Sequence, residues 1–227
     1  MSISHYPSVV TDGMALYFDA ASAMSYSGSG SSWNDLSGRG NHGTLVNGPI
    51  FDANTNKGAF TFDGTNDCVN FSVPDVGTIL SIEMWARIKS FSNGMPFGFD
   101  RYDVWANGGR IGFNTAASDI YGLSSTQVTN LGLLNQWKHY IFEMRSDVSY
   151  TNNKIYINGQ NQSLSQVAGT ENASLRNFNS GNGRISSWLF SNVFNISMDH
   201  SQFKVYNRAL SAAEVANNYN AMRGRYI

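Results

Sequence analysis

The chain is poor in charge and contains a single cysteine, and both scarcities narrow the range of functions. Charged residues make up 14% of the 227 residues, and the formal net charge is -1. An average domain carries about 25% charged residues. Without a basic surface to attract phosphate groups, we expect no nucleic-acid binding. Because Cys68 stands alone, an internal disulfide and a thiolate zinc cluster are both excluded.

Long apolar runs and targeting signals are also missing. No stretch approaches the roughly 18 consecutive apolar residues of a membrane-spanning helix, so we expect no insertion into a membrane. The first residues lack the basic and then apolar pattern of a secretory signal peptide, which predicts synthesis in a cytoplasm.

What the chain does contain is a series of short alternating segments separated by glycine turns. Apolar side chains fall on one face of residues 81–88 and of residues 137–145. Residues 154–160 end in Asn158-Gly159, a dipeptide typical of tight hairpins. Further strands are predicted at residues 14–18, 59–62, 110–113 and 203–206. Because no helical periodicity separates these strands, we predict an all-β fold of two antiparallel sheets.

One helix is predicted near the C-terminus. Ser211 and Glu214 have the spacing of a capping box, in which each side chain satisfies a backbone amide of the other. Leu210 and Val215 supply the matching hydrophobic staple. We expect this helix to dock on the sandwich as a structural element. The predicted organisation is an arm at residues 1–12 followed by one domain at residues 13–227.

The stretch SGRGNHG at residues 37–43 contains the G-x-G-x-x-G spacing of a dinucleotide-binding loop. Such a loop needs an apolar strand before the glycines and a helix after them to hold the pyrophosphate. Here Ser32–Leu36 does not have the pattern of a buried strand, and the segment between Gly43 and Pro49 is too short for a helix. We therefore expect no NAD to bind.

The same stretch lies in Asp35–Thr44, DLSGRGNHGT, which resembles a signature of laminin-G-like domains in the concanavalin A-like lectin/glucanase superfamily. Further segments fit that family in the same order along the chain. They are FDGTNDCV at 62–69, SIEMW at 81–85, WKHY at 137–140, KIYING at 154–159 and VYNRALSAAE at 205–214. The resemblance covers nearly the whole chain, with Cys68 at a position where an aromatic residue is usual.

This resemblance implies a concanavalin A-like jelly-roll sandwich, often with a calcium ion and a glycan-binding edge. The size of the chain and its wealth of Asn, Ser and Gly also look like lectin-like structural proteins of tailed phages. The expected function is a non-enzymatic virion protein, either a capsid decoration or fibre-associated, that binds polysaccharide. Its expected location is the virion, and its expected partners are other virion proteins, copies of itself and a cell-surface glycan.

The densest group of residues suited to sugars lies at 99–109, FDRYDVWANGG. An aromatic ring can lie under the C–H face of a sugar, while planar polar side chains bind its hydroxyls. The candidate glycan-binding residues are Asp100, Arg101, Tyr102, Asp103, Trp105 and Asn107. The alternative is that Trp105 and Val104 belong to a strand and that the charges form pairs at its rim.

The competing function is a glycoside hydrolase or lyase. A hydrolase on this fold needs two carboxylates flanking the glycosidic bond. Glu83 and Glu143 are the candidate pair, because both lie mid-strand on the face opposite the apolar residues. Cross-strand ion pairs with Arg87 and Arg145 are the alternative interpretation of the same residues.

Calcium prefers hard oxygen ligands, and two turns offer them. One turn contains Asp35 and Asn41, and the other contains Asp63 and Asp67. Because Asp and Asn side chains also bond their own backbone in turns, ordinary turn chemistry is the alternative to a structural Ca²⁺ site.

Overall fold

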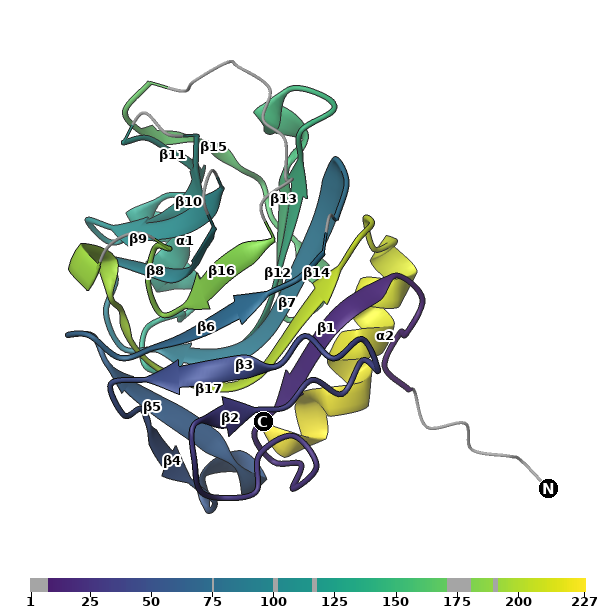
Figure 1. The fold of residues 1–227 in the computed structure, drawn as a ribbon. Coiled ribbons are helices and arrows are strands. Elements are labelled where there is room, and N and C mark those ends of the chain that lie inside the picture. Colours follow the sequence, from purple (N-terminus) through teal and green to yellow (C-terminus); the bar gives the residue numbers. More distant parts are fainter. Residues whose placement is uncertain (1–7, 75, 100–101, 116–117, 171–180, 190–191) are drawn as a thin grey trace.

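A computed structural model describes residues 8–74, 76–99, 102–115, 118–170, 181–189 and 192–227. The chain forms two antiparallel sheets packed face to face, as predicted (Figure 1). Sheet A consists, in spatial order, of β14 (Gln160–Asn161), β13 (Lys154–Ile157), β12 (Trp137–Arg145), β7 (Ile79–Ile88), β17 (Ser197–Tyr206), β5 (Ala59–Asp63) and β4 (Ile50–Asp52), and β1 (Met14–Asp19) also pairs with β17.

Sheet B carries the longer series of short strands. Its spatial order is β15 (Ser165–Ala168), β11 (Ile120–Leu123), β10 (Arg110–Asn114), β9 (Asp103–Asn107), β8 (Asn93–Phe99), β16 (Asn182–Ile185), β6 (Cys68–Ser72), β3 (Gly43–Val46) and β2 (Ser32–Trp33). The 3₁₀ turns are η1 (Thr55–Lys57), η2 (Tyr150–Asn152), η3 (Asn192–Phe194) and η4 (Arg223–Arg225).

The core lies between the sheets because apolar side chains alternate along the strands as the sequence predicts. In β7 and β12, Ile82 lies opposite Phe142 and Met84 opposite Tyr140, and all four side chains are buried in this core. Glu83, which falls between them, points to the outer face of sheet A.

The predicted C-terminal helix is confirmed as α2 (Ala212–Met222), which covers the outer face of sheet A (Figure 1). Ser211 accepts from the Glu214 amide, and the Glu214 carboxylate accepts from the Ser211 amide at 2.8 Å. Leu210 and Val215 are buried together beneath the helix, so the predicted staple is present.

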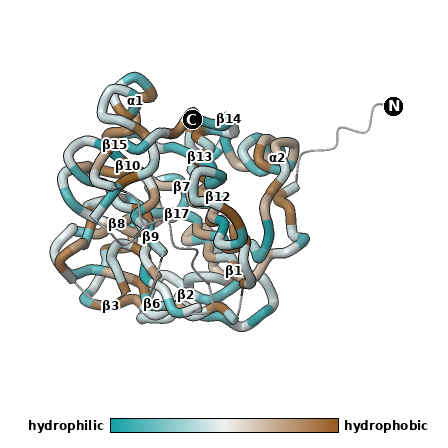
Figure 2. Tube along the Cα trace, turned by 90° about the horizontal axis from the view of Figure 1, so that it is seen from above, coloured by the Kyte–Doolittle hydropathy of each residue, from teal (hydrophilic) through white to brown (hydrophobic). Residues whose placement is uncertain are grey.

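A second helix, α1 (Ser125–Asn130), was not predicted. It begins with a capping box of Ser124 and Gln127 but buries only Val128, so it lacks the apolar stripe that reveals a helix in a sequence. α1 and α2 lie on different sides of the molecule (Figures 1 and 2). No helix within the described ranges is both long and apolar enough to span a membrane.

Residues 8–12 of the predicted arm pack on the domain's own helix. Asn218 Oδ1 accepts from the Val10 amide at 2.8 Å, and the Tyr206 hydroxyl donates to the Val10 carbonyl at 3.1 Å. Asp12 pairs with Arg208 at 2.9 Å. The first seven residues lie outside the described part of the chain.

Candidate functional site

Strand β9 divides the predicted glycan-binding residues between two environments. Val104 and Ala106 point into the core, so Asp103, Trp105 and Asn107 point to the outer face of sheet B. Trp105 and Asn107 are half-buried, whereas Asp103 is buried.

Tyr102 does not join this outer face. It is 4% exposed and stacks on Phe99 in the core, with the ring centroids 4.3 Å apart. Its placement therefore corrects the prediction that it contacts glycan. The remaining two candidates, Asp100 and Arg101, lie outside the described residues.

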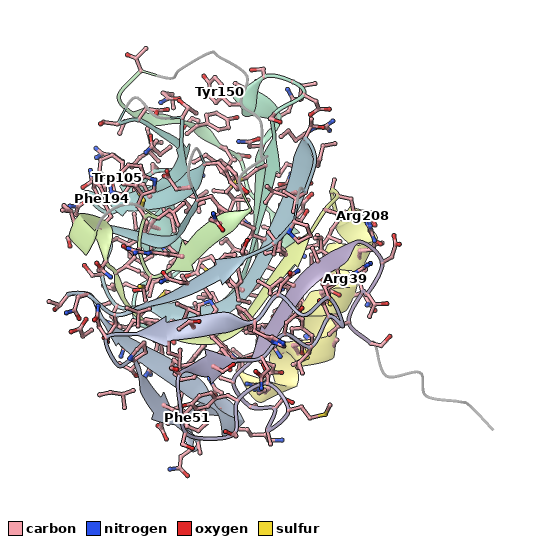
Figure 3. The ribbon with its side chains drawn as sticks, viewed as in Figure 1. Arg39, Phe51, Trp105, Tyr150, Phe194 and Arg208 are labelled. Carbon is pink, nitrogen blue, oxygen red and sulfur yellow. The ribbon has the colours of Figure 1, made fainter. Side chains whose placement is uncertain are left out.

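The indole of Trp105 is held in a fixed orientation by groups from two other segments. Its Nε1 donates a hydrogen bond of 2.8 Å to Asn93 Oδ1 on β8. Phe194 of η3 meets the indole edge-on at 6.0 Å, and Trp188 meets Phe194 in the same way at 6.4 Å. Trp105 and Phe194 lie side by side at one edge of the molecule (Figure 3). We call Trp105, Trp188 and Phe194 the aromatic platform.

The positions beside Trp105 on the next strands carry no side chains. Gly112 of β10 lies directly opposite Trp105, and Gly122 of β11 lies opposite Gly112. A Cβ at Gly112 would collide with the backbone of Tyr121, and one at Gly122 with that of Ile111, so the close approach of the strands requires both glycines. The indole therefore borders bare backbone on that side.

Planar polar groups flank the platform. Asn93 lies opposite Asn107, which in turn lies opposite Arg110, so three side chains with hydrogen-bonding planes form one row across β8, β9 and β10. In a second row, Arg184 Nε donates to Asn70 Oδ1 at 2.8 Å. An apolar ring bordered by such groups matches the mixed apolar and hydroxyl character of a sugar.

Sequence reasoning missed Asn93 and Phe194. Asn93 lies 12 residues before Trp105 and Phe194 lies 89 residues after it, and only the pairing of β8 with β9 and the path of η3 bring them together. The serine and glycine around Asn93 indicate a turn, but nothing in the sequence indicates its partner.

The candidate catalytic glutamates lie on the outer face of sheet A. Glu83 pairs with Ile141 and Glu143 with Ser81, so the two carboxylates occupy diagonal positions on neighbouring strands. Diagonal positions are typically about 7–8 Å apart, a spacing within reach of an inverting hydrolase. Access, rather than separation, decides whether this pair can act on a polysaccharide.

Glu83 is sealed beneath α2. Its side chain is 0% exposed, and it accepts hydrogen bonds from Lys204 Nζ at 2.7 Å and from Asn218 Nδ2 of the helix at 2.6 Å. Burial alone would raise the pKa of Glu83, but Lys204 and His139 hold it well below its usual value. Because these groups enclose its carboxylate, a sugar chain does not reach Glu83.

Glu143 is also buried, at 1% exposure, and its carboxylate lies 3.2 Å from Lys154 Nζ. The partner is therefore a lysine on β13 rather than the predicted Arg145, whose guanidinium pairs with Asp147 at 2.8 Å. Arg87 pairs with Asp199. Both glutamates thus have ion-pair partners, as the structural alternative requires, but the partners differ from those predicted.

At the first calcium candidate, the side chains of Asp35 and Asn41 form hydrogen bonds with nearby groups of the protein. Both oxygens of Asp35 accept hydrogen bonds from donors of the adjoining loop and of β1, and the Asn41 amide nitrogen donates to the Ala15 carbonyl at 2.8 Å. This donor set fixes the glycine loop, in which Gly38 and Gly40 have positive φ, and strand β3 follows without a helix. These hydrogen bonds of Asp35 and Asn41 are the ordinary turn chemistry that the sequence offers as the alternative to a Ca²⁺ site.

The second candidate is similar. Asp63 accepts from the Thr65 amide at 2.7 Å, and Asp67 accepts from the Asp63 amide at 3.2 Å. Burial raises the pKa of Asp67, whereas the amide hydrogen bonds lower that of Asp63. No group of three or more His, Cys, Asp or Glu side chains suited to a metal occurs in the described part of the chain. A Ca²⁺ site at either turn stays a prediction.

Comparison with known protein families and solved structures agrees with the fold described above. The laminin-G-type family model described as the concanavalin A-like lectin/glucanases superfamily matches residues 63–216, more than half of the chain. No curated protein sequence gives a significant match.

Solved structures show the same fold at low sequence identity. Trypanosoma rangeli sialidase in complex with the inhibitor DANA is 13% identical with a TM-score of 0.66, over 97% of this chain and 34% of the sialidase. The botulinum neurotoxin serotype D ligand binding domain in complex with N-acetylneuraminic acid is 12% identical with a TM-score of 0.62, over 92% of this chain and 51% of that domain. The binding domain of Paraclostridial Mosquitocidal Protein 1 is 14% identical with a TM-score of 0.63, over 93% and 52%. The chain thus spans about half the length of the toxin domains and a third of the sialidase.

Proposed function

Because the chain belongs to the concanavalin A-like lectin/glucanase superfamily, we propose that it is a non-enzymatic carbohydrate-binding module whose binding surface is the outer face of sheet B around Trp105. The observation that carries this proposal is the fixed indole of Trp105 beside bare glycine backbone. A sugar ring has apolar C–H faces and an equatorial belt of hydroxyls, so it can stack on the indole while its hydroxyls reach Asn93 and Asn107. The neighbour solved with N-acetylneuraminic acid supports the choice of ligand class.

A pre-oriented aromatic ring matters because sugars bind weakly. Most of their hydroxyls exchange one hydrogen bond to water for one to protein, which leaves a small net gain. Contact with an indole that is already held in place adds apolar burial without an entropic cost for ordering the ring. Affinity beyond this level comes from repeated copies of the module on one particle or surface.

The expected test is a glycan array probed with the wild-type protein and with Trp105→Ala. Removal of a central aromatic contact typically costs about 2 kcal/mol, or roughly 30-fold in affinity, so array signals should vanish. Trp105→Phe is the matched control, because it keeps an aromatic face and should retain part of the signal. Thermal melting should be similar for the three proteins, since Trp105 is on the outer face. Equal binding by Trp105→Ala, or no glycan bound by the wild type, contradicts the proposal.

We further propose that the module is displayed on a phage virion, as a decoration or fibre-associated protein that contacts other virion proteins and copies of itself. Support comes from the low charge and from the Asn-rich, Ser-rich and Gly-rich composition. Mass spectrometry and immunogold imaging of purified particles test this location. Detection at regular positions on the particle supports it, and presence only in the unassembled fraction contradicts it.

A further inference from the structure

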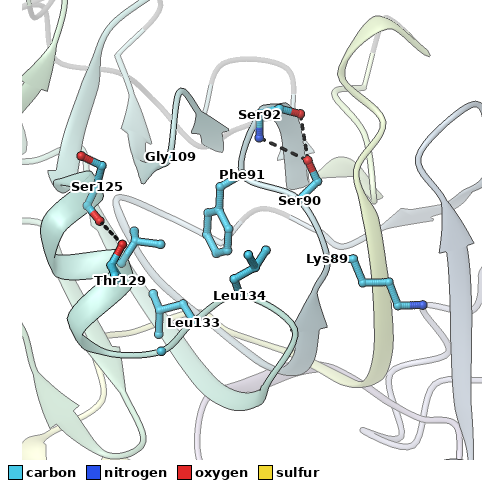
Figure 4. Close-up of a pocket in the computed structure, with 11 residues that line it drawn as sticks. Lys89, Ser90, Phe91, Ser92, Gly109, Ser125, Thr129, Leu133 and Leu134 are labelled. Atoms are coloured by element: carbon cyan, nitrogen blue, oxygen red, sulfur yellow. Dashed lines mark hydrogen bonds between the residues drawn. The ribbon is translucent and has the colours of Figure 1, made fainter.

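A pocket of about 530 Å³ opens at the end of the sandwich where α1 faces the loop between β7 and β8 (Figure 4). This volume lies within the range of about 300–1,000 Å³ that is typical of small-ligand sites. Its lining residues are Lys89, Ser90, Phe91, Ser92, Gly109, Ser125, Val128, Thr129, Gly132, Leu133 and Leu134. None of them is among the predicted glycan-binding, catalytic or calcium-binding residues.

The pocket combines an apolar floor with a rim of hydroxyls. Phe91 and Leu133 belong to the core beneath it, while Leu134 is 51% exposed at its mouth. The rim includes Ser92, whose hydroxyl lies 2.8 Å from that of Ser90, and Thr129, which donates to the Ser125 carbonyl at 3.0 Å. Apolar walls with neutral hydrogen-bonding groups at the edge fit a ligand of the same mixed character.

Charge decides which ligands this pocket favours. Among the described residues that line the pocket, Lys89 alone is charged, and its Nζ is 2.5 Å from Asp199 Oδ1. Asp199 also accepts from Thr61 and Arg87, and its pKa is held below the usual value against the effect of burial by Lys89, Thr61 and Arg87. Because the lysine charge is already paired, the pocket offers no free charge to an anion or a cation and favours a neutral ligand.

The pocket adjoins the aromatic platform through two short connections. Ser92 at its rim is followed directly by Asn93, which holds the Trp105 indole. Gly109 at its rim belongs to the turn between β9 and β10, and its amide donates to the Phe91 carbonyl at 2.9 Å. Three residues, Ala106, Asn107 and Gly108, separate Trp105 from Gly109, so the path has four steps of at most about 3.3–3.6 Å each. An oligosaccharide of a few residues is long enough to cover that distance.

We propose that the pocket is a second subsite that binds a neutral pyranose residue of the same oligosaccharide that crosses the aromatic platform. The C–H face of the sugar would lie on Phe91 and Leu134, and its hydroxyls would bond the serine and threonine rim. This inference rests on the proposed function. It makes the binding surface selective for chain length, since a mono- or disaccharide reaches only one of the two subsites.

The test compares Thr129→Trp with Thr126→Trp. Both positions are exposed on α1, but only Thr129 lines the pocket, so the first variant fills it and the second adds the same surface elsewhere. Binding of neutral cello-, malto- and chito-oligosaccharides of two to six residues is measured by calorimetry, with Trp105→Ala in parallel. We expect Thr129→Trp to weaken binding of the longer chains about tenfold and to leave the disaccharide unchanged, while Thr126→Trp matches the wild type.

The outcomes separate the two proposals. Wild-type affinity of Thr129→Trp for every chain length overturns the second subsite and leaves the platform standing. Loss of binding in Thr129→Trp with full binding in Trp105→Ala overturns the platform and keeps the pocket as a site. Absence of binding by the wild type to every sugar in the series overturns both.

Discussion

The outer face of each sheet carries a tryptophan in the middle of a strand, but the two tryptophans differ in how far they are buried. On sheet A, Trp85 is fully buried beneath Tyr226, with ring centroids 4.1 Å apart, and Glu83 is sealed under α2. On sheet B, Trp105 has a comparable place mid-strand but is only half-buried, with Phe194 of the short η3 edge-on against its indole (Figure 3). The difference lies in the C-terminal segment, which packs on the outer face of sheet A.

This contrast indicates what polar groups do on each face. The charges on sheet A are partnered within the protein: Lys204 binds Glu83, and Asp19 binds Arg225 at 2.8 Å. They specify how α2 and the C-terminus dock. The amides around Trp105 are arranged at the surface, where a ligand can reach them. Changes on sheet A should therefore alter stability, and changes on sheet B should alter binding.

The largest effect is expected from Lys204→Ala. It removes one partner of the buried Lys204–Glu83 ion pair, a loss that typically costs about 3–5 kcal/mol. Arg39→Ala, at an exposed position of the glycine loop, should stay within about 0.5 kcal/mol of the wild type. Urea unfolding of both variants checks the difference. Equal stability of the two would show that the network beneath α2 has no structural role.

The second-largest expected effect is a loss of stability in acid. Burial lowers the pKa of His200 from 6.5 to about 3. Between these two pH values, the unfolded chain binds a proton at His200 and the folded chain does not. The stability is therefore complete above pH 6.5 and falls as the pH drops from 6.5 toward 3, by at most about 1.4 kcal/mol per pH unit for this group. The lowered pKa values of Glu83 and Asp199 add to the loss below about pH 4.5.

Urea unfolding at pH 7.5, 5.5 and 4.5 measures this dependence, and His200→Leu should remove the part between pH 6.5 and 4.5. Glycan affinity of the folded protein should stay constant from pH 7.5 to 5.5, because Trp105, Asn93 and Asn107 do not titrate. Constant stability over the same range, or affinity that follows the stability, would contradict the separation of the two faces.

A smaller effect is expected from Asn93→Ala. The change removes one exposed, neutral hydrogen bond to the Trp105 indole, which is worth about 0.5–1.5 kcal/mol, so the affinity for glycan should fall roughly 2- to 10-fold. The melting temperature should match that of the wild type. Asn66→Ala, at an exposed turn on the Asp63 side of the molecule, is the control. An unchanged affinity in Asn93→Ala would contradict both roles given to Asn93, the support of the indole and the contact with a sugar hydroxyl.

Much of the fold could be predicted because its signals are local. Alternation in residues 81–88 and 137–145 reports which side chains enter the core, and the Ser211 capping box marks the start of α2. Asn158 and Gly159 have the positive φ values of 51° and 80° that their hairpin requires. Each of these signals acts within a few residues of its effect.

Less of the candidate site could be predicted, because it depends on contacts between residues that are far apart in the sequence. Trp105 was proposed because residues 99–109 are rich in the residue types that suit sugars. Tyr102 was misplaced because it lies in the connection between β8 and β9, where its ring stacks on Phe99 in the core. The burial of Glu83 follows from the docking of a helix more than a hundred residues away, which no local pattern reports.

The most direct test of the account follows the indole N–H signals of ¹⁵N-labelled protein while a glycan identified on the array is added. The missing signal in Trp105→Ala assigns the Trp105 indole, and the buried indoles of Trp33 and Trp85 serve as internal references. We predict that the Trp105 signal shifts to saturation while those of Trp33 and Trp85 stay in place. A shift of the Trp85 signal with a stationary Trp105 would place the ligand on sheet A and contradict the account.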